Sequence, residues 1–162
     1  MLTFGRATPE DAPDLRRLLL DEAVRSYWNI IGDSPALQRD LADHFASRAE
    51  ALAEQLRSSD GVCWVARDGK QVVGMCGFNP QRRLIHSVYV AESMRGKGVG
   101  TALMRYALGE CGPGRILLLV AAENTGALRF YERLGFTITG RDANWRFENG
   151  SIPEIEMSLE QE

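Results

Sequence analysis

A glycine-rich junction between an apolar strand and a helix constrains the fold of this chain more than any other feature. The apolar run 88–90 is followed by Arg95 and then by three glycines at alternate positions, Gly96, Gly98 and Gly100. The N-terminus of a helix presents N–H groups without intrahelical partners and the positive end of the helix dipole, and glycines let a ligand approach that backbone closely. The junction therefore predicts a seat for the pyrophosphate group of a phosphorylated cofactor.

The spacing of this junction excludes two better-known phosphate-binding motifs. A Walker A loop needs four residues between its first glycine and a Gly-Lys-Ser/Thr sequence, and Lys97 stands in the wrong place for it. A dinucleotide fingerprint needs G-x-G-x-x-G and an acidic residue after a second parallel strand, and neither is present. A glycine-rich turn that caps an ordinary helix is the competing interpretation.

Length and composition indicate a single globular domain over residues 1–162. With 44% hydrophobic residues, 25% charged residues and a net charge of −3, the chain is not expected to be a general binder of nucleic acids or anionic membranes. The N-terminus lacks the shape of a signal peptide, and the longest apolar run, 116–122, is too short to cross a membrane. Three cysteines without metal-ligand spacing and only two histidines predict reduced thiols, no bound metal and a cytoplasmic location.

Hydrophobic periodicity and turn residues predict an α/β protein with a mixed sheet. Helices are expected from Thr8 or Pro9 until a break at 29–35, over 35–56, from the glycine junction to Glu110, and over 124–134. The continuously apolar segment 116–120 is predicted to be a central strand, parallel to strand 83–90 in a right-handed βαβ unit. The other expected strands are 2–7, 62–67, 71–78, 136–140 and 154–159, with turns at 68–69 and 149–150.

A second group of residues lies on and just after the helix 124–134. Asn124 can cap this helix, and Gly135 can end it in the left-handed conformation. The helix directly follows the apolar strand 116–120, and in open parallel sheets ligands bind beyond the carboxyl ends of the strands. Tyr131 is therefore a candidate site residue, although an amphipathic helix with Tyr131 in the core is a competing interpretation.

Together the two groups resemble the signatures of the acetyl-CoA-dependent N-acetyltransferase superfamily, abbreviated GNAT. The first signature, Gln/Arg-x-x-Gly-x-Gly/Ala, is matched by Arg95, Gly98 and Gly100. The second, Asn-x-x-Ala-x-x-x-Tyr-x-x-x-Gly-Phe, is matched at every position from Asn124 to Phe136. The resemblance covers nearly the whole chain and implies a twisted mixed sheet of about seven strands flanked by about four helices.

The resemblance also implies roles for the matched residues. Backbone groups of Val88 and Val90 would pair with the pantetheine arm of acetyl-CoA, and the N–H groups of 95–101 would hold its pyrophosphate. Asn124 would contact the pantetheine, Tyr131 would face the thioester sulfur, and Arg133 could approach the nucleotide. The implied cofactor-binding residues are Val88, Tyr89, Val90, Arg95, Gly96, Lys97, Gly98, Val99, Gly100, Thr101, Asn124, Ala127, Tyr131 and Arg133.

The implied reaction is transfer of an acetyl group to a primary amine. Tyr131, neutral at pH 7, suits protonation of the leaving thiolate. The base that deprotonates the amine stays open, because Leu84 occupies the region where many relatives carry a glutamate. His86 is a candidate base, and we expect it on the same strand face as Leu84, Val88 and Val90.

The alternatives for the base and for the function are also open. His86 could equally be a hydrogen-bonded histidine of the sheet, and Glu123 or relayed water are weaker candidates for the base. A catalytically weak acyl-CoA-binding regulatory module is the alternative to an enzyme. The acceptor, a small-molecule or peptide amine, would bind near 27–32 and 144–147, where aromatic residues and Arg146 suit an acidic group, or those aromatics could pack loops or a homodimer interface.

Overall fold

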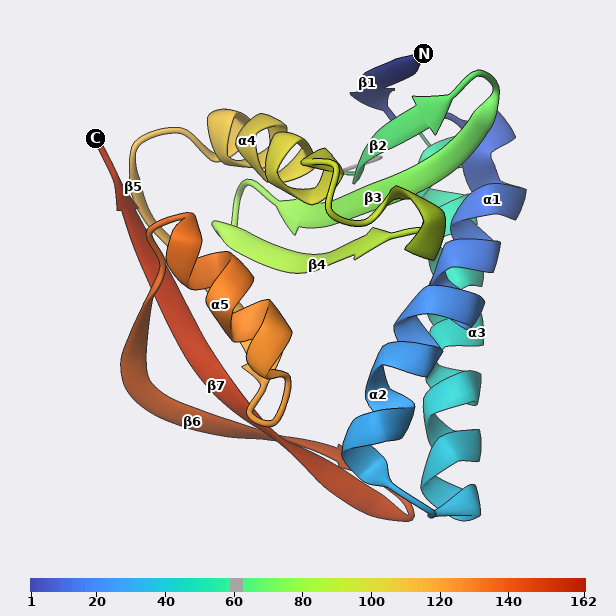
Figure 1. Ribbon diagram of the computed structural model, residues 1–162, viewed down its shortest axis with the longest axis vertical. Helices are drawn as coiled ribbons and strands as arrows, with labels where there is room; N and C mark the ends of the chain where they lie inside the picture. The colour runs from blue at the N-terminus through green and yellow to red at the C-terminus, as the bar shows by residue number, and fades with distance from the viewer. Residues whose placement is uncertain (59–62) are drawn as a thin grey trace.

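A computed structural model describes residues 1–58 and 63–162. Seven strands form one mixed sheet in the order β1-β2-β3-β4-β5-β7-β6, with helices on both of its faces (Figure 1). All neighbouring strands are antiparallel except β4 and β5, which confirms the predicted βαβ unit. The strands are β1 (Leu2–Arg6), β2 (Cys63–Asp68), β3 (Gln71–Asn79), β4 (Leu84–Val90), β5 (Gly114–Ala121), β6 (Thr137–Phe147) and β7 (Gly150–Gln161).

The helices agree with the expected pattern, except that the first helical stretch continues to Ile31, inside the expected break at 29–35, and contains a π-helical segment. The first helical stretch comprises a 3-10 turn η1 (Pro9–Asp11), α1 (Ala12–Arg17), a π-helical segment η2 (Leu18–Ala23) and α2 (Val24–Ile31). Thr8 precedes it as the N-cap, and Gly32 ends it at a φ of +63°. The remaining helical elements are α3 (Pro35–Arg57), the 3-10 turn η3 (Glu92–Met94), α4 (Val99–Cys111) and α5 (Thr125–Arg133).

The β6–β7 hairpin differs from the expected strands and turn. Strands β6 and β7 are much longer than the expected strands 136–140 and 154–159. Their residues continue to pair with each other toward the hairpin turn, up to Phe147 opposite Gly150. The turn itself is therefore formed by residues 148–149 instead of 149–150. Val62, the first residue of the expected strand 62–67, lies outside the described residues.

Strands β4 and β5 separate soon after they begin to pair. The parallel register joins only Leu84 with Leu117 and Ile85 with Leu118. Toward their carboxyl ends β4 continues to pair with β3, while β5 pairs with β7 along its whole length. The sheet is thus open between β4 and β5 at the end where the glycine junction leads into α4.

The β6–β7 hairpin and α3 meet on the lower side of the molecule (Figure 1). At the hairpin turn, the Asn149 backbone N–H donates to the Asp40 carboxylate at 2.9 Å, and a Cβ on Gly150 would lie 3.2 Å from Leu37. Trp145, on the same hairpin, packs edge-to-face on Tyr27 with ring centroids 5.4 Å apart. The hairpin, α2 and α3 therefore enclose space on one face of the open sheet.

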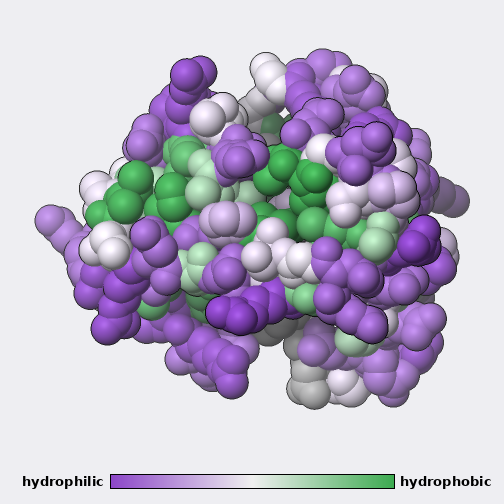
Figure 2. All heavy atoms as spheres, turned by 90° about the horizontal axis from the view of Figure 1, so that it is seen from below, coloured by the Kyte–Doolittle hydropathy of each residue, from purple (hydrophilic) through white to green (hydrophobic). Residues whose placement is uncertain are grey.

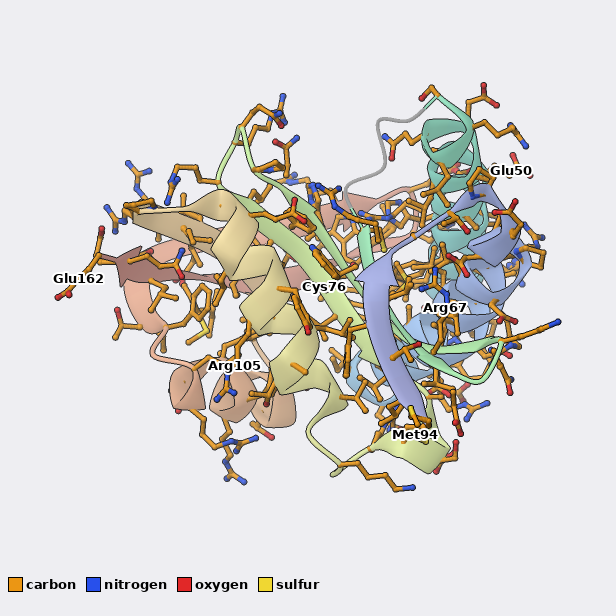
Figure 3. All side chains as sticks on the ribbon, turned by 90° about the horizontal axis from the view of Figure 1, so that it is seen from above. Glu50, Arg67, Cys76, Met94, Arg105 and Glu162 are labelled. Carbon is orange, nitrogen blue, oxygen red and sulfur yellow. The ribbon has the colours of Figure 1, made fainter. Side chains whose placement is uncertain are left out.

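On the other face of the sheet, α4 covers the central strands. Its apolar residues join the continuous core, and Cys76 of β3 lies beside α4, with its Sγ 4.0 Å from the Met104 Sδ (Figure 3). All three cysteines are buried and free, as expected. No helix among the described residues has the length and apolar character that a membrane crossing requires.

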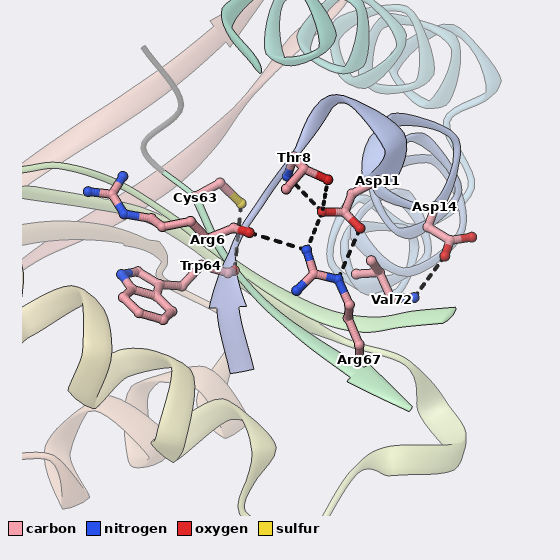
Figure 4. A network of polar contacts seen from close by, with 8 residues as sticks. All are labelled: Arg6, Thr8, Asp11, Asp14, Cys63, Trp64, Arg67 and Val72. Atoms are coloured by element: carbon pink, nitrogen blue, oxygen red, sulfur yellow. Dashed lines mark hydrogen bonds and ion pairs between the residues drawn. The ribbon is translucent and has the colours of Figure 1, made fainter. Parts of the chain in front are cut away.

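A buried ion pair joins the start of the first helix to strand β2 (Figure 4). The Arg67 Nε donates to the Asp11 carboxylate at 3.1 Å, and the same carboxylate accepts the Thr8 backbone N–H at 2.7 Å. Burial acts to raise the pKa of Asp11, but the hydrogen bonds and charge of Arg67 and the Thr8 N–H together hold it below its usual range. Asp11 is thus ionised in the folded protein and fixes the entry into the helix.

Candidate functional site

The glycine junction forms an open seat at the N-terminus of α4. Gly96 and Gly98 adopt φ values of +72° and +78°, which other residues rarely adopt, and a Cβ at either position would meet nothing within 4 Å. The first intrahelical hydrogen bond runs from the Ala102 N–H to the Gly98 carbonyl, so the preceding N–H groups of the helix have no intrahelical acceptor. Space and unpaired donors together fit a phosphate group.

Gly100 also has a packing role, in addition to the binding role that its motif position predicts. A Cβ there would lie 3.3 Å from the Phe130 ring of α5 and 3.7 Å from Val88. The absence of a side chain at Gly100 therefore lets α5 and β4 approach α4. A side chain would thus find open space at Gly96 and Gly98 but would contact α5 at Gly100.

Arg95 anchors the junction to the first helix. Its Nη2 donates to the Glu22 carboxylate at 2.7 Å, and Glu22 also accepts the Glu92 backbone N–H at 3.3 Å. Glu22 is buried in the π-helical segment η2, which had no signal in the sequence. The ion pair holds both ends of the η3 turn against the first helix.

Two cavities follow this junction toward α5. The first, here called the loop cavity, has a volume of about 320 Å³, and the second, the α5 cavity, has about 430 Å³. They share Val90, Arg95, Gly100 and Phe130, so they form one continuous groove. Of the fourteen cofactor-binding residues expected from the resemblance, all but Lys97 line this groove; the Lys97 side chain is exposed beside Met94.

The α5 residues lie at the inner end of the groove. Asn124 caps α5 as predicted, because its side-chain oxygen accepts the Ala127 N–H at 3.1 Å. Tyr131 is 8% exposed and lines the α5 cavity. Burial raises the pKa of Tyr131 well above its usual range, so its hydroxyl stays protonated at neutral pH.

A third cavity, here called the α3 cavity, lies on the opposite face of β4. It has a volume of about 220 Å³ and is enclosed by α2, α3, β4, β5 and the β6–β7 hairpin. Tyr89 lines both this cavity and the α5 cavity, so the two cavities approach this residue from opposite faces of β4. Its lining residues are Tyr27, His44, Phe45, Arg48, Leu84, Ile85, His86, Ser87, Tyr89, Leu119, Trp145 and Glu154.

The expected strand face of His86 is right for Leu84 but wrong for Val88 and Val90, because β4 contains a bulge at this residue. The β3–β4 register steps from Gly77 opposite Ser87 to Phe78 opposite Ile85, which leaves His86 without a partner. The bulge breaks the alternation of side chains along the strand. His86 lines the α3 cavity with Ser87 and Leu84, while Val88 lines the groove on the other face.

The α3 cavity is lined by ionisable groups whose pKa values are shifted in opposite directions. Burial first, and then the positive charges of Arg48 and Arg82, lower the pKa of His86, so its imidazole is neutral at pH 7. Burial raises the pKa of Glu154. Burial, reinforced by the negative charge of Glu154, raises the pKa of Tyr27 to about 12.

Sequence reasoning missed several residues of this cavity. Tyr27 and Trp145 were expected near an acceptor, but His44, Arg48, Ser87 and Glu154 were not, because they come from three elements far apart in the chain. The only indication of these four residues in the sequence is that each is a polar residue in an element that also contains buried apolar residues. Arg146 and Glu123, which were considered from the sequence, line none of the three cavities.

Comparisons with known proteins identify the family and the fold. The model of the family described as "Acetyltransferase (GNAT) family" matches residues 20–136. A probable N-acetyltransferase of Mycobacterium tuberculosis is 31% identical over 116 residues, which cover 68% of this chain and 67% of that protein. Other relatives are longer: the match with a mycothiol acetyltransferase of Corynebacterium efficiens covers 27% of its length.

Solved structures share the fold. The PaiA N-acetyltransferase of Thermoplasma acidophilum in complex with coenzyme A has a TM-score of 0.76 at 14% identity, covering 99% of both chains. A putative acetyltransferase of Salmonella typhimurium with acetyl-CoA has a TM-score of 0.69 at 20% identity, covering 99% of this chain and 94% of the other. At these identities the likeness is one of fold, including the mixed sheet expected from the sequence.

Proposed function

This chain belongs to the acetyltransferase (GNAT) family, and we propose that it transfers the acetyl group of acetyl-CoA to a primary amine bound in the α3 cavity. One observation carries the proposal. The groove that begins at the glycine junction ends at Tyr131 and Tyr89, and the α3 cavity reaches Tyr89 from the opposite face of the sheet. A cofactor in the groove and an amine in the cavity would therefore meet at the opening between β4 and β5.

The groove fits acetyl-CoA in its chemistry as well as its shape. The open space over Gly96 and Gly98 and the unpaired N–H groups of α4 suit the pyrophosphate, and the edges of Val88 and Val90 beside the separated β5 suit an extended pantetheine arm. When bound, acetyl-CoA supplies a thioester whose carbonyl carbon accepts the amine.

Tyr131 is the proposed proton donor to the leaving sulfur. Its raised pKa keeps the hydroxyl protonated, and its position at the inner end of the α5 cavity supports this role. As the new C–N bond forms and the C–S bond breaks, the thiolate would take the Tyr131 proton. Solvent would then return a proton to Tyr131.

The acceptor ammonium must first lose a proton, and two residues of the α3 cavity are candidates for the base. His86, proposed from the sequence, is neutral, but Arg48 and Arg82 oppose the positive charge that it would gain. Glu154 has a raised pKa and forms no ion pair with any cation among the residues that the structure describes. Its charge helps to raise the pKa of Tyr27, which lines the α3 cavity beside Tyr89. We therefore favour Glu154 and retain His86 as the candidate to be tested beside it.

The proposal is tested by incubating the protein with acetyl-CoA and a panel of primary amines, with mass spectrometry of the products. We expect a substrate-dependent gain of one acetyl group and release of CoA. Acetyl-CoA should also raise the melting temperature in a dose-dependent way. At a concentration about one hundred times its Kd, it should add about 2.7 kcal/mol to the free energy of unfolding, and NAD and ATP should have much smaller effects. Stabilisation without product from any amine would favour the regulatory acyl-CoA-binding module, and no stabilisation would remove the cofactor assignment.

A further inference from the structure

The α3 cavity carries two polar groups, Arg48 and Ser87, for which the described residues 1–58 and 63–162 supply no hydrogen-bond or ion-pair partner. Arg48 of α3 and Ser87 of β4 converge over Gly77: the Arg48 Nη2 lies 3.8 Å, and the Ser87 Oγ 3.4 Å, from the point that a Cβ on Gly77 would occupy. Because Gly77 has no side chain, the space between the guanidinium and the hydroxyl is open. Arg48 also lines a neighbouring cavity of about 290 Å³, together with His86.

Neither group is satisfied within the described part of the chain. The Ser87 residue is 8% exposed, and its Oγ is the one buried side-chain oxygen or nitrogen there without a hydrogen-bond partner. Arg48 is half-buried, and no carboxylate of residues 1–58 or 63–162 forms an ion pair with it. A buried hydroxyl without a hydrogen-bond partner lowers the stability of the folded protein by about 1–3 kcal/mol. Ser87 and Arg48 therefore do not stabilise the fold through polar contacts and are available to bind a ligand.

The chemistry of the pair selects an anion. A guanidinium presents a planar fork of N–H donors that matches a carboxylate, and a serine hydroxyl adds a further donor. Two positive charges, those of Arg48 and Arg82, lie close enough to the neighbouring His86 to help burial lower its pKa. A carboxylate placed here would be paired instead of buried alone.

The cavity also carries a group of the opposite charge. Glu154 extends from β7 as a half-buried carboxylate, and Tyr27 lies within reach of the charges of both Glu154 and Arg48. Phe45 and Trp145 also line the cavity and form an aromatic wall with ring centroids 6.1 Å apart. On the lower side of the molecule, hydrophobic residues gather in the centre and hydrophilic residues surround them (Figure 2).

We propose that the acceptor is a small amino acid-like molecule whose carboxylate binds Arg48 and Ser87 while its amine faces Glu154. This inference rests on the proposed acetyl transfer and names the class of its acceptor. The volume of about 220 Å³ fits a molecule of amino-acid size, since drug-sized ligands occupy cavities of about 300–1,000 Å³. The aromatic wall would contact the apolar part of this molecule.

Matched pairs of acceptors test the carboxylate directly. Leucine, phenylalanine and β-alanine are each compared with the corresponding carboxamide, which keeps the amine and the carbon chain but removes the negative charge. We expect at least one acid to be acetylated with a kcat/KM about tenfold or more above that of its amide, because charge-assisted pairing is lost in the amide. Equal values for acids and amides would overturn the proposal.

Variants of the two donors show whether they cause this preference. Arg48→Gln should lower kcat/KM for the acid by about tenfold or more, mainly through KM, and should leave the amide unchanged. Arg39→Gln makes the same change in net charge on the same helix, but Arg39 is exposed and lines no cavity described above, so no effect is expected. Ser87→Ala should lower kcat/KM for the acid about threefold to tenfold and should not lower the melting temperature. If Ser87 instead had a structural role, the substitution would lower the melting temperature.

A binding measurement separates this proposal from the acetyl transfer itself. With the protein saturated by CoA, calorimetry compares the N-acetylated acid with the N-acetylated amide and repeats both with Arg48→Gln. Binding of the acid alone, lost in the variant, supports the carboxylate site even if no amine is acetylated. Acetylation of amines with no dependence on Arg48 overturns the carboxylate site and leaves the acetyl transfer standing.

Discussion

The guanidinium of Arg95 donates a hydrogen bond of 2.7 Å to the carboxylate of Glu22, which joins the glycine junction to the π-helical segment of the first helix. Arg95 opens the signature that the sequence shares with the GNAT family, and Glu22 lines the α5 cavity beside it. The pair therefore fixes the position of the backbone that is proposed to bind pyrophosphate.

The first prediction concerns this pair. Glu22→Gln removes one charge and leaves the shape of the side chain, so the junction should become more mobile and the affinity for acetyl-CoA should fall about fivefold, or about 1 kcal/mol. Isothermal titration calorimetry measures the affinity. Glu92→Gln is the control, because Glu92 forms only an exposed pair with Arg25 at 3.6 Å and should leave the affinity unchanged. Equal effects of the two variants would contradict the anchoring role.

Gly98 and Gly112 form a matched pair at the two ends of α4. Both have positive φ values, +78° and +66°, and a Cβ at either would meet no atom within 4 Å. Alanine at either position should cost about 1–2 kcal/mol of stability through backbone strain. Gly98→Ala should also lower the affinity for acetyl-CoA about tenfold, because its methyl group occupies the proposed phosphate seat, whereas Gly112→Ala should not. An unchanged affinity in folded Gly98→Ala would move the phosphate site elsewhere.

Tyr131→Phe tests the proposed proton donor. The change removes one hydroxyl and little volume, so kcat should fall by about 10²–10⁴ while the affinity for acetyl-CoA changes far less. Steady-state kinetics and calorimetry on the same preparation measure both quantities. Tyr106→Phe, on the exposed side of α4, is the control and should retain full activity. Full activity in Tyr131→Phe would leave Tyr131 as a packing residue.

The pH dependence of the rate distinguishes Glu154 from His86. The base must be unprotonated, so kcat/KM should fall as the pH drops through its pKa. Burial raises the pKa of Glu154 from 4.5, and burial with the arginine charges lowers that of His86 from 6.5, so both would produce an acidic limb in the same region. Glu154→Gln should lower kcat by about 10²-fold or more and remove this limb, whereas His86→Gln should preserve it. The opposite result would assign the base to His86.

Stability should depend on pH through Asp11. The folded protein holds the pKa of Asp11 below its usual value of 3.8, so the stabilisation is present above that value and is lost as the pH falls through the lowered one. Asp11→Asn should therefore lower the free energy of unfolding by about 1–3 kcal/mol at pH 7, and the difference from the unchanged protein should shrink toward pH 3. Urea unfolding at several pH values measures it. Asp68→Asn, in an exposed pair with the N-terminus, should have almost no effect.

Features that depend on neighbouring residues were largely predictable from the sequence. The glycine junction, the Asn124 cap of α5 and the apolar run of β5 each lie within one turn or one strand, and their conformation follows from local propensity. The order of these elements then required a parallel βαβ unit, and nearly all of the expected groove residues line one groove. Which of them bind acetyl-CoA stays a prediction.

The tertiary structure alone decided the composition of the α3 cavity. The bulge at His86 depends on how β4 pairs with β3, and it transferred His86 to the face opposite Val88. Arg48 and Glu154 are more than a hundred residues apart and meet only because α3 and the β6–β7 hairpin pack on the same face of the sheet. A local pattern determines the conformation of a segment, but the chemistry of a cavity depends on non-local packing, which no short stretch of sequence contains.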